Sequence, residues 1–113
     1  MYENDGFVSF CPYASRFNYE VWIFPKEHVK SITNLTDEQL VGLADVLKHV
    51  LVKLAEMNAS YNFVLHYAPK GTDLHFHIEV LPRIAKWGGF ELSSGIIVNQ
   101  VAPEDAAVFY RSD

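Results

Sequence analysis

Polar and apolar residues alternate along residues 73–83, which is the pattern of a half-buried β-strand. The alternation places His75, His77 and Glu79 on one face of the strand and apolar side chains on the other. A strand that only packs a core has no reason to carry two imidazoles and a carboxylate on the same face. This face is therefore the first candidate for a metal or phosphate site.

A second pattern repeats every three to four residues and predicts an amphipathic helix at residues 36–57. Its apolar positions are Leu40, Leu43, Leu47, Val50, Leu51 and Leu54. Thr36 and Gln39 have the spacing of a capping box at the start of this helix. His49 falls on the face opposite the leucines, and we expect it to be a solvated surface residue.

Shorter apolar runs predict strands at residues 7–11, 20–24, 62–67 and 95–98, and a short helix near Pro103. Pro69 and Gly71 favour a turn at residues 68–73, so the strands on either side should form an antiparallel hairpin. The predicted class is α+β: a single domain over residues 1–113, with an antiparallel sheet packed by one long helix and a short C-terminal helix.

The hairpin would bring histidines from two strands together. If Tyr67 lies opposite Leu74, His66 lies opposite His75, with Cβ atoms roughly 4.5–5.5 Å apart. His77 follows two residues further along the same face. Three neutral imidazoles at one place would suit zinc, iron, copper or nickel.

A fourth ligand for such a metal must come from elsewhere. Glu79 lies roughly 13 Å along the strand from His75, at about 3.3 Å per residue, and we expect it to be too far away. Water, another chain or another domain would then supply the ligand. The alternative is that the histidines hydrogen-bond one another and buried water in a polar cleft.

Composition narrows the function classes. The chain has 113 residues, half of them hydrophobic, and a formal net charge of −5, which argues against nucleic acid or an anionic membrane as a partner. Cys11 is the only cysteine, so there is no internal disulfide, and a lone thiol suits the reducing cytosol. No apolar run is long enough to cross a bilayer, and the acidic first residues do not read as a signal peptide. We expect a cytoplasmic protein.

Histidine can also attack phosphorus and form a covalent nucleotidyl intermediate. His75 and His77 are the candidates for such a nucleophile. However, the chain has no glycine-rich phosphate loop followed by a helix, and Gly88-Gly89 is more typical of a turn.

Four short motifs together carry a resemblance to a known family. They are Phe-Pro-Lys-Glu-His at residues 24–28, His-Tyr-Ala-Pro at 66–69, His-Phe-His at 75–77 with Leu-Pro-Arg at 81–83, and Gly-Phe-Glu at 89–91. In these motifs the chain resembles the histidine triad superfamily, and more closely the C-terminal half of the galactose-1-phosphate uridylyltransferases. The resemblance covers nearly the whole chain and implies a histidine triad-like fold.

The resemblance implies half of a two-half nucleotidyltransferase that acts in galactose metabolism. The third histidine of the triad is replaced by Glu79, and the chain has no His-Pro dipeptide, whereas the family's nucleophile lies in a His-Pro-His motif of the N-terminal half. The chain alone would then lack the nucleophile and would be inactive. The resemblance implies that the full enzyme acts on UDP-glucose and a hexose 1-phosphate and that it is a homodimer.

The resemblance also assigns site residues. His66, His75 and His77 match three ligands of a structural iron or zinc site, whose fourth ligand is a glutamate of the other half. Residues that follow Leu-Pro-Arg contact the hexose phosphate in the family. The matching positions here are Lys86, Trp87, Phe90, Glu91 and Asn99.

Two other functions stay open at this point. One is a stand-alone histidine triad-type nucleotide hydrolase or transferase that uses His75 or His77. The other is a non-enzymatic binding or dimerisation module with the hairpin face as its contact surface. The first predicts turnover that His77→Ala abolishes, and the second predicts neither bound metal nor affinity for sugar phosphates.

Overall fold

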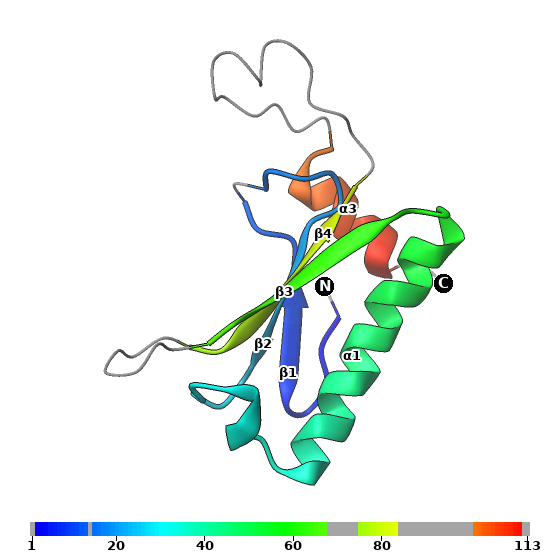
Figure 1. Ribbon diagram of the computed structural model, residues 1–113. Helices are drawn as coiled ribbons and strands as arrows, with labels where there is room; N and C mark the ends of the chain where they lie inside the picture. The colour runs from blue at the N-terminus through cyan, green and yellow to red at the C-terminus, as the bar shows by residue number, and fades with distance from the viewer. Residues whose placement is uncertain (1, 14, 68–74, 84–100, 112–113) are drawn as a thin grey trace.

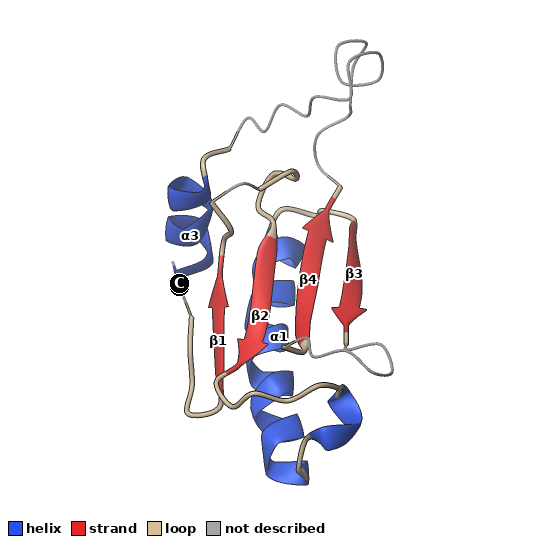
Figure 2. Ribbon diagram, turned by 90° about the vertical axis from the view of Figure 1, so that its left-hand side faces the viewer, coloured by secondary structure: helices blue, strands red, loops and turns tan. Residues whose placement is uncertain are grey.

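In the computed structural model, which describes residues 2–13, 15–67, 75–83 and 101–111, four strands form one antiparallel sheet in the order β1-β2-β4-β3 (Figures 1 and 2). In chain order the elements are β1 (Phe7–Phe10), β2 (Val21–Pro25), the 3₁₀ helix η1 (Ile32–Asn34), α1 (Asp37–Glu56), β3 (Tyr61–His66), β4 (His77–Pro82) and α3 (Pro103–Arg111). The predicted α+β class with an antiparallel sheet, a long helix and a short C-terminal helix is confirmed. The strand expected at residues 95–98 lies outside the described residues.

Helix α1 begins where the sequence predicts it. The side chain of Thr36 accepts a hydrogen bond from the backbone N–H of Gln39, and the Gln39 side chain accepts one from the backbone N–H of Thr36. Asp37 and Glu38 occupy the first turn, where the helix dipole favours negative charge. The capping box therefore satisfies two N–H groups that would otherwise lack partners at the helix end.

Replacing Thr36 by alanine tests this cap. We expect the free energy of unfolding to fall by about 0.5–2 kcal/mol, because alanine leaves the Gln39 N–H without its side-chain acceptor. Chemical denaturation measures the change, and Thr36→Ser serves as the control because it keeps the hydroxyl. If both variants lost the same free energy of unfolding, the methyl group of Thr36 and not its capping hydroxyl would be the stabilising group.

The core lies between α1 and one face of the sheet, as Figure 2 shows with α1 behind the strands. Its fully buried side chains alternate along the strands and recur at helical spacing along α1. They include Phe7, Val21, Ile23, Phe76, Ile78 and Val80 from the sheet side and Val46, Val50 and Leu54 from the helix. Since successive side chains of a strand point to opposite faces, the intervening residues lie on the face away from α1.

Helix α3 packs beside α1 through Tyr110, which is fully buried. The Tyr110 hydroxyl donates to the backbone oxygen of Tyr19 at 2.6 Å, and its own backbone oxygen accepts from His49 Nε2 at 2.6 Å. Burial raises the pKa of the Tyr110 phenol, so this hydroxyl stays a donor at neutral pH. His49 also stacks on Tyr2, and it is therefore not the solvated surface residue that the sequence predicts.

Cys11 is partly buried beside the core. Burial raises the pKa of its thiol to about 11. The thiolate is the reactive form of cysteine, so Cys11 is a poor nucleophile near neutral pH.

Candidate metal centre

The site lies where β3 ends and β4 begins, on the sheet face away from α1. In the antiparallel ladder His66 pairs with His77, and Val64 pairs with Glu79. Directly opposed residues of such a ladder share a face, and residues two apart along a strand do so as well. The backbone therefore places His66, His77 and Glu79 on one patch of sheet.

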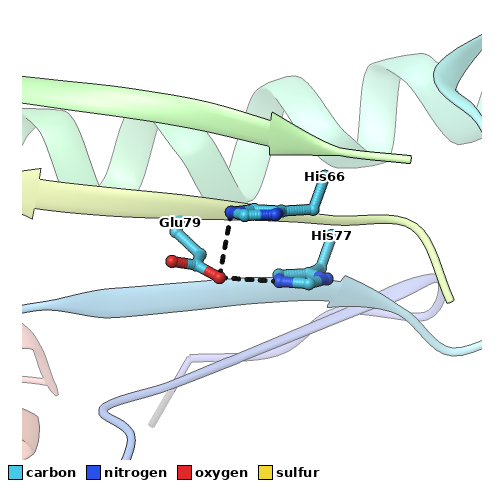
Figure 3. A group of neighbouring side chains, drawn as sticks. All are labelled: His66, His77 and Glu79. Carbon is cyan, nitrogen blue, oxygen red and sulfur yellow. Dashed lines mark hydrogen bonds and ion pairs between the residues drawn. The ribbon is translucent and has the colours of Figure 1, made fainter. Parts of the chain in front are cut away.

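Figure 3 shows the two imidazole rings side by side, with Nε2 of each directed at the Glu79 carboxylate. Glu79 Oε2 lies 3.1 Å from His66 Nε2 and 2.9 Å from His77 Nε2. His77 is 8% exposed and Glu79 9%, whereas the His66 side chain is 38% exposed at the edge of the sheet. One ligand atom from each residue lies within 4.8 Å of the others, so the three residues could hold a metal ion.

The two ring nitrogens of His77 face different acceptors. His77 Nδ1 lies 3.2 Å from the carbonyl oxygen of His75, and a carbonyl can only accept, so Nδ1 carries the proton. Nε2 of the same ring lies 2.9 Å from the Glu79 carboxylate, which also only accepts, so a proton or a cation lies between these two atoms. A metal ion held by the neutral ring would take the place of that proton, and the donor set fits such an ion.

Aromatic rings hold His77 from both sides. Phe24 stacks on it with centroids 4.5 Å apart at 11°, and His66 stacks on its other side at 4.6 Å and 5°. The Trp22 ring lies 5.5 Å away and is itself fixed, because its Nε1 donates to Glu20 at 2.7 Å. This packing limits the rotation of the His77 ring and keeps Nε2 aimed at the same point.

The predicted strand register is wrong by two residues. His66 pairs with His77 and not with His75, because β4 begins only at His77 and the connection from β3 is longer than the expected turn. A shift of two residues conserves the side-chain alternation, so the predicted face is correct although the partner is not.

His75 lies outside the group of three. Its ring contacts Phe24 at a centroid distance of 5.2 Å and His28 at 4.9 Å. Its Nε2 is buried and has no hydrogen-bond partner in the described part of the chain. The sequence prediction that three imidazoles converge is thus met by two of them, and a ligand role of His75 stays a prediction.

Glu79 is the residue that sequence reasoning dismissed. The expectation that Glu79 lies too far away to join the histidines is wrong for His66 and His77, although Glu79 is four residues from His75 along the strand. The nearer neighbours are His77, two residues away, and His66 on the adjacent strand. The sequence does indicate this neighbour, since the alternation that places His77 on the polar face of the strand places Glu79 on the same face.

The expected hexose-phosphate contacts lie outside the described residues. These are Lys86, Trp87, Phe90, Glu91 and Asn99, and they stay predictions. In the described part of the chain, no helix has the length and apolar character needed to cross a membrane.

Residues 1–98 match the family described as galactose-1-phosphate uridyl transferase, C-terminal domain. ADP-glucose phosphorylase from Arabidopsis thaliana is 35% identical over 117 residues, which cover 96% of this chain and 33% of the relative. Galactose-1-phosphate uridylyltransferase from Thermotoga maritima is 32% identical over 121 residues, which cover 95% of this chain and 38% of the relative. The chain thus spans between a third and two fifths of the length of these relatives.

Solved structures agree with this match. The crystal structure of the Arabidopsis ADP-glucose phosphorylase with bound ADP-glucose superposes with a TM-score of 0.89 at 34% identity, over 98% of this chain and 39% of that one. A zinc-bound histidine triad family protein from Mycobacterium smegmatis superposes with a TM-score of 0.66 over 96% of this chain and 78% of that one, at 21% identity, and shows the shared fold alone. The chain therefore belongs to the galactose-1-phosphate uridylyltransferase family, where it corresponds to the C-terminal domain with its histidine triad-like fold.

Proposed function

We propose that this chain is the C-terminal domain of a hexose-1-phosphate nucleotidyltransferase, with UDP-hexose or a related nucleoside diphosphate hexose as the substrate class. The observation that supports this most directly is the group of His66, His77 and Glu79 on a domain of this family. The two kinds of relative support the substrate class. One is named for uridylyl transfer to galactose 1-phosphate, and the other has been solved with bound ADP-glucose.

In this proposal the group holds zinc or iron as a structural ion. Imidazole and carboxylate are suitable ligands for both metals, and Nε2 of His77 already points into the group. A bound ion would supply positive charge that holds side chains of β3 and β4 in one arrangement. Residues of the chain orient the ligand ring: Phe24 and His66 stack on the ring of His77, and the carbonyl of His75 accepts from its Nδ1.

The segment after β4 would contact the hexose phosphate. In this proposal Lys86 neutralises a phosphate, Glu91 accepts hydrogen bonds from sugar hydroxyls, and Trp87 offers its face to the pyranose ring. Phe90 and Asn99 complete the expected contacts. The nucleophilic histidine would come from an N-terminal half, because no histidine of this chain is followed by proline. A homodimer of the full enzyme and a cytoplasmic location belong to the same proposal.

Ligand binding and turnover by the purified chain test the proposal. Isothermal titration with galactose 1-phosphate, glucose 1-phosphate, UDP-glucose and ADP-glucose is expected to detect binding of at least one of them. Chromatography of the same mixtures is expected to show no new products. Glu91→Gln should weaken binding, whereas Glu104→Gln, in the first turn of α3, should leave binding unchanged and serves as the control.

Two results would contradict the proposal. Absence of binding for all four ligands would remove the substrate class. Turnover by the chain alone, abolished in His77→Ala, would instead establish a stand-alone nucleotide hydrolase or transferase, with His77 as its nucleophile.

A further inference from the structure

We propose that Glu20 is a positioning residue: it fixes the indole of Trp22, and Trp22 in turn orients the ring of His77. Glu20 lies directly before β2 and is not a member of the group of His66, His77 and Glu79. The orientation of the His77 ring does not depend on a bound ion. The effect of Glu20 on metal binding, in contrast, rests on the metal centre of the proposed function.

Glu20 is a buried carboxylate whose hydrogen bonds, in the described part of the chain, all come from N–H groups. It is only 3% exposed. Its Oε1 accepts from the backbone N–H groups of Arg16 at 3.0 Å and Phe17 at 3.3 Å, and its Oε2 accepts from Trp22 Nε1 at 2.7 Å. Burial of a carboxylate is costly without such bonds, so the three donors hold the side chain in one place. A side chain fixed in this way can anchor the indole.

The bond between Glu20 and Trp22 runs along the face of the sheet that carries the metal centre. The two residues are two positions apart, and Trp22 lies directly opposite Glu79 in the ladder, so all three side chains are on one face. The indole N–H can only donate, and its 2.7 Å bond to Glu20 is at the short end of the usual range. Loss of this bond would leave the indole free to change its rotamer.

Trp22 transmits this constraint to His77. Strand β2 lies next to β4 in the sheet, as Figure 2 shows. The Trp22 ring is tilted by 34° to the His77 ring, with centroids 5.5 Å apart. It also lies 6.4 Å from the ring of Phe24, which stacks on His77. Trp22 therefore supports the His77 ring both directly and through Phe24, and a displaced indole should let that ring move.

The alternative is that Glu20 only shapes the loop that precedes β2. Another contact supports the same loop without involving the indole: the Tyr110 hydroxyl of α3 donates to the backbone oxygen of Tyr19 at 2.6 Å. Tyr110→Phe removes this contact and leaves the bond between Glu20 and Trp22 in place. It is therefore the matched control for a loop that is loosened without loss of the anchor.

Carbon-13 relaxation of the His77 ring in the metal-free chain tests the link, because the order parameter measures how freely the ring moves. Glu20→Met keeps an unbranched side chain of similar length but offers no oxygen to the indole, and we expect it to lower the order parameter. Trp22→Phe should lower it as well. The double variant should lie no lower than Trp22→Phe alone, because Glu20 acts through the indole. Tyr110→Phe should leave the order parameter unchanged.

Two results would overturn the inference. One is that Glu20→Met leaves the order parameter unchanged, or lowers it equally with and without the indole. The other is the absence of nuclear Overhauser contacts between the Trp22 indole and the His77 ring in the unaltered chain. The second measurement needs no variant, so it decides the matter even if Glu20→Met does not fold.

Cobalt(II) titrations of the same chains after chelator treatment measure the consequence for the metal centre. We expect Glu20→Met to bind about 10-fold more weakly, the lower end of what loss of a ligand's partner typically costs, because Trp22 contacts the ligand ring without a hydrogen bond. Equal affinity of Glu20→Met and the unaltered chain would overturn the role of Glu20 at the metal centre. If the unaltered chain binds no cobalt, the metal centre itself is refuted, while the relaxation measurement still decides whether Glu20 positions His77.

Discussion

The double variant His66→Ala/His77→Ala is expected to bind neither zinc nor iron. It removes both ring nitrogens that face Glu79, and the carboxylate that remains is a single oxygen ligand. Elemental analysis after dialysis should find about one metal ion per unaltered chain and none in the variant. His28→Ala is the control, because His28 is an exposed imidazole outside the group of three and close to it.

Stability gives an independent measurement of the same site. A ligand that binds only the folded state stabilises it by about 2.7 kcal/mol when its free concentration is 100 times the dissociation constant. The unaltered chain should lose this increment when a chelator removes the metal. The double variant should unfold at the same denaturant concentration with and without chelator. Retention of one tightly bound ion by the variant would contradict the metal centre.

Replacing Phe76 by alanine is expected to lower the free energy of unfolding by about 3–5 kcal/mol, the usual cost of removing a buried aromatic ring. Phe76 is fully buried in the core, and its backbone N–H donates to the Val29 oxygen at 2.8 Å. The loss is a large part of the 5–15 kcal/mol that stabilise a typical domain. Urea denaturation followed by circular dichroism measures it.

Phe63→Ala provides the matched control for this core substitution. Phe63 is an aromatic residue of β3 and is 49% exposed, so much of its ring is already in contact with water. Its loss should cost clearly less than the loss of Phe76. Similar costs for the two variants would contradict the placement of Phe76 in the core.

Phe76 also links the core to the metal centre, because it lies between His75 and His77 in the chain. If Phe76→Ala loosens the start of β4, the ring of His77 should be held less firmly. The variant is therefore expected to bind metal more weakly than the unaltered chain even where it remains folded. A cobalt(II) titration of the chelator-treated variant and of the unaltered chain measures this effect.

Local patterns account for what could be predicted of the fold. The spacing of Thr36 and Gln39 marks the start of α1, because the capping box uses only neighbouring residues. The alternation of polar and apolar residues assigns His77 and Glu79 to one face, because a strand repeats every two residues. These features depend on short stretches of chain, and the structure confirms them.

Contacts between distant segments could not be predicted in the same way. Lys53 reads as a polar position of α1, yet its side chain is only 6% exposed, pairs with Glu56 and lies over the Phe109 ring of α3. His49 likewise contacts α3, because its Nε2 hydrogen-bonds to the backbone oxygen of Tyr110. The surroundings of both residues depend on where α3 packs against α1. That position cannot be predicted from a short stretch of sequence.

The sequence by itself determined that a carboxylate and histidines share one face of a strand, and that this face is opposite the core. The tertiary structure decided which of them meet, by pairing His66 with His77 and by bringing the Glu79 carboxylate within reach of both rings. The physical reason is the two-residue period of a strand. It fixes the face of every side chain, but a shift of two residues leaves that pattern unchanged, so only the packed sheet selects the register and with it the ligands.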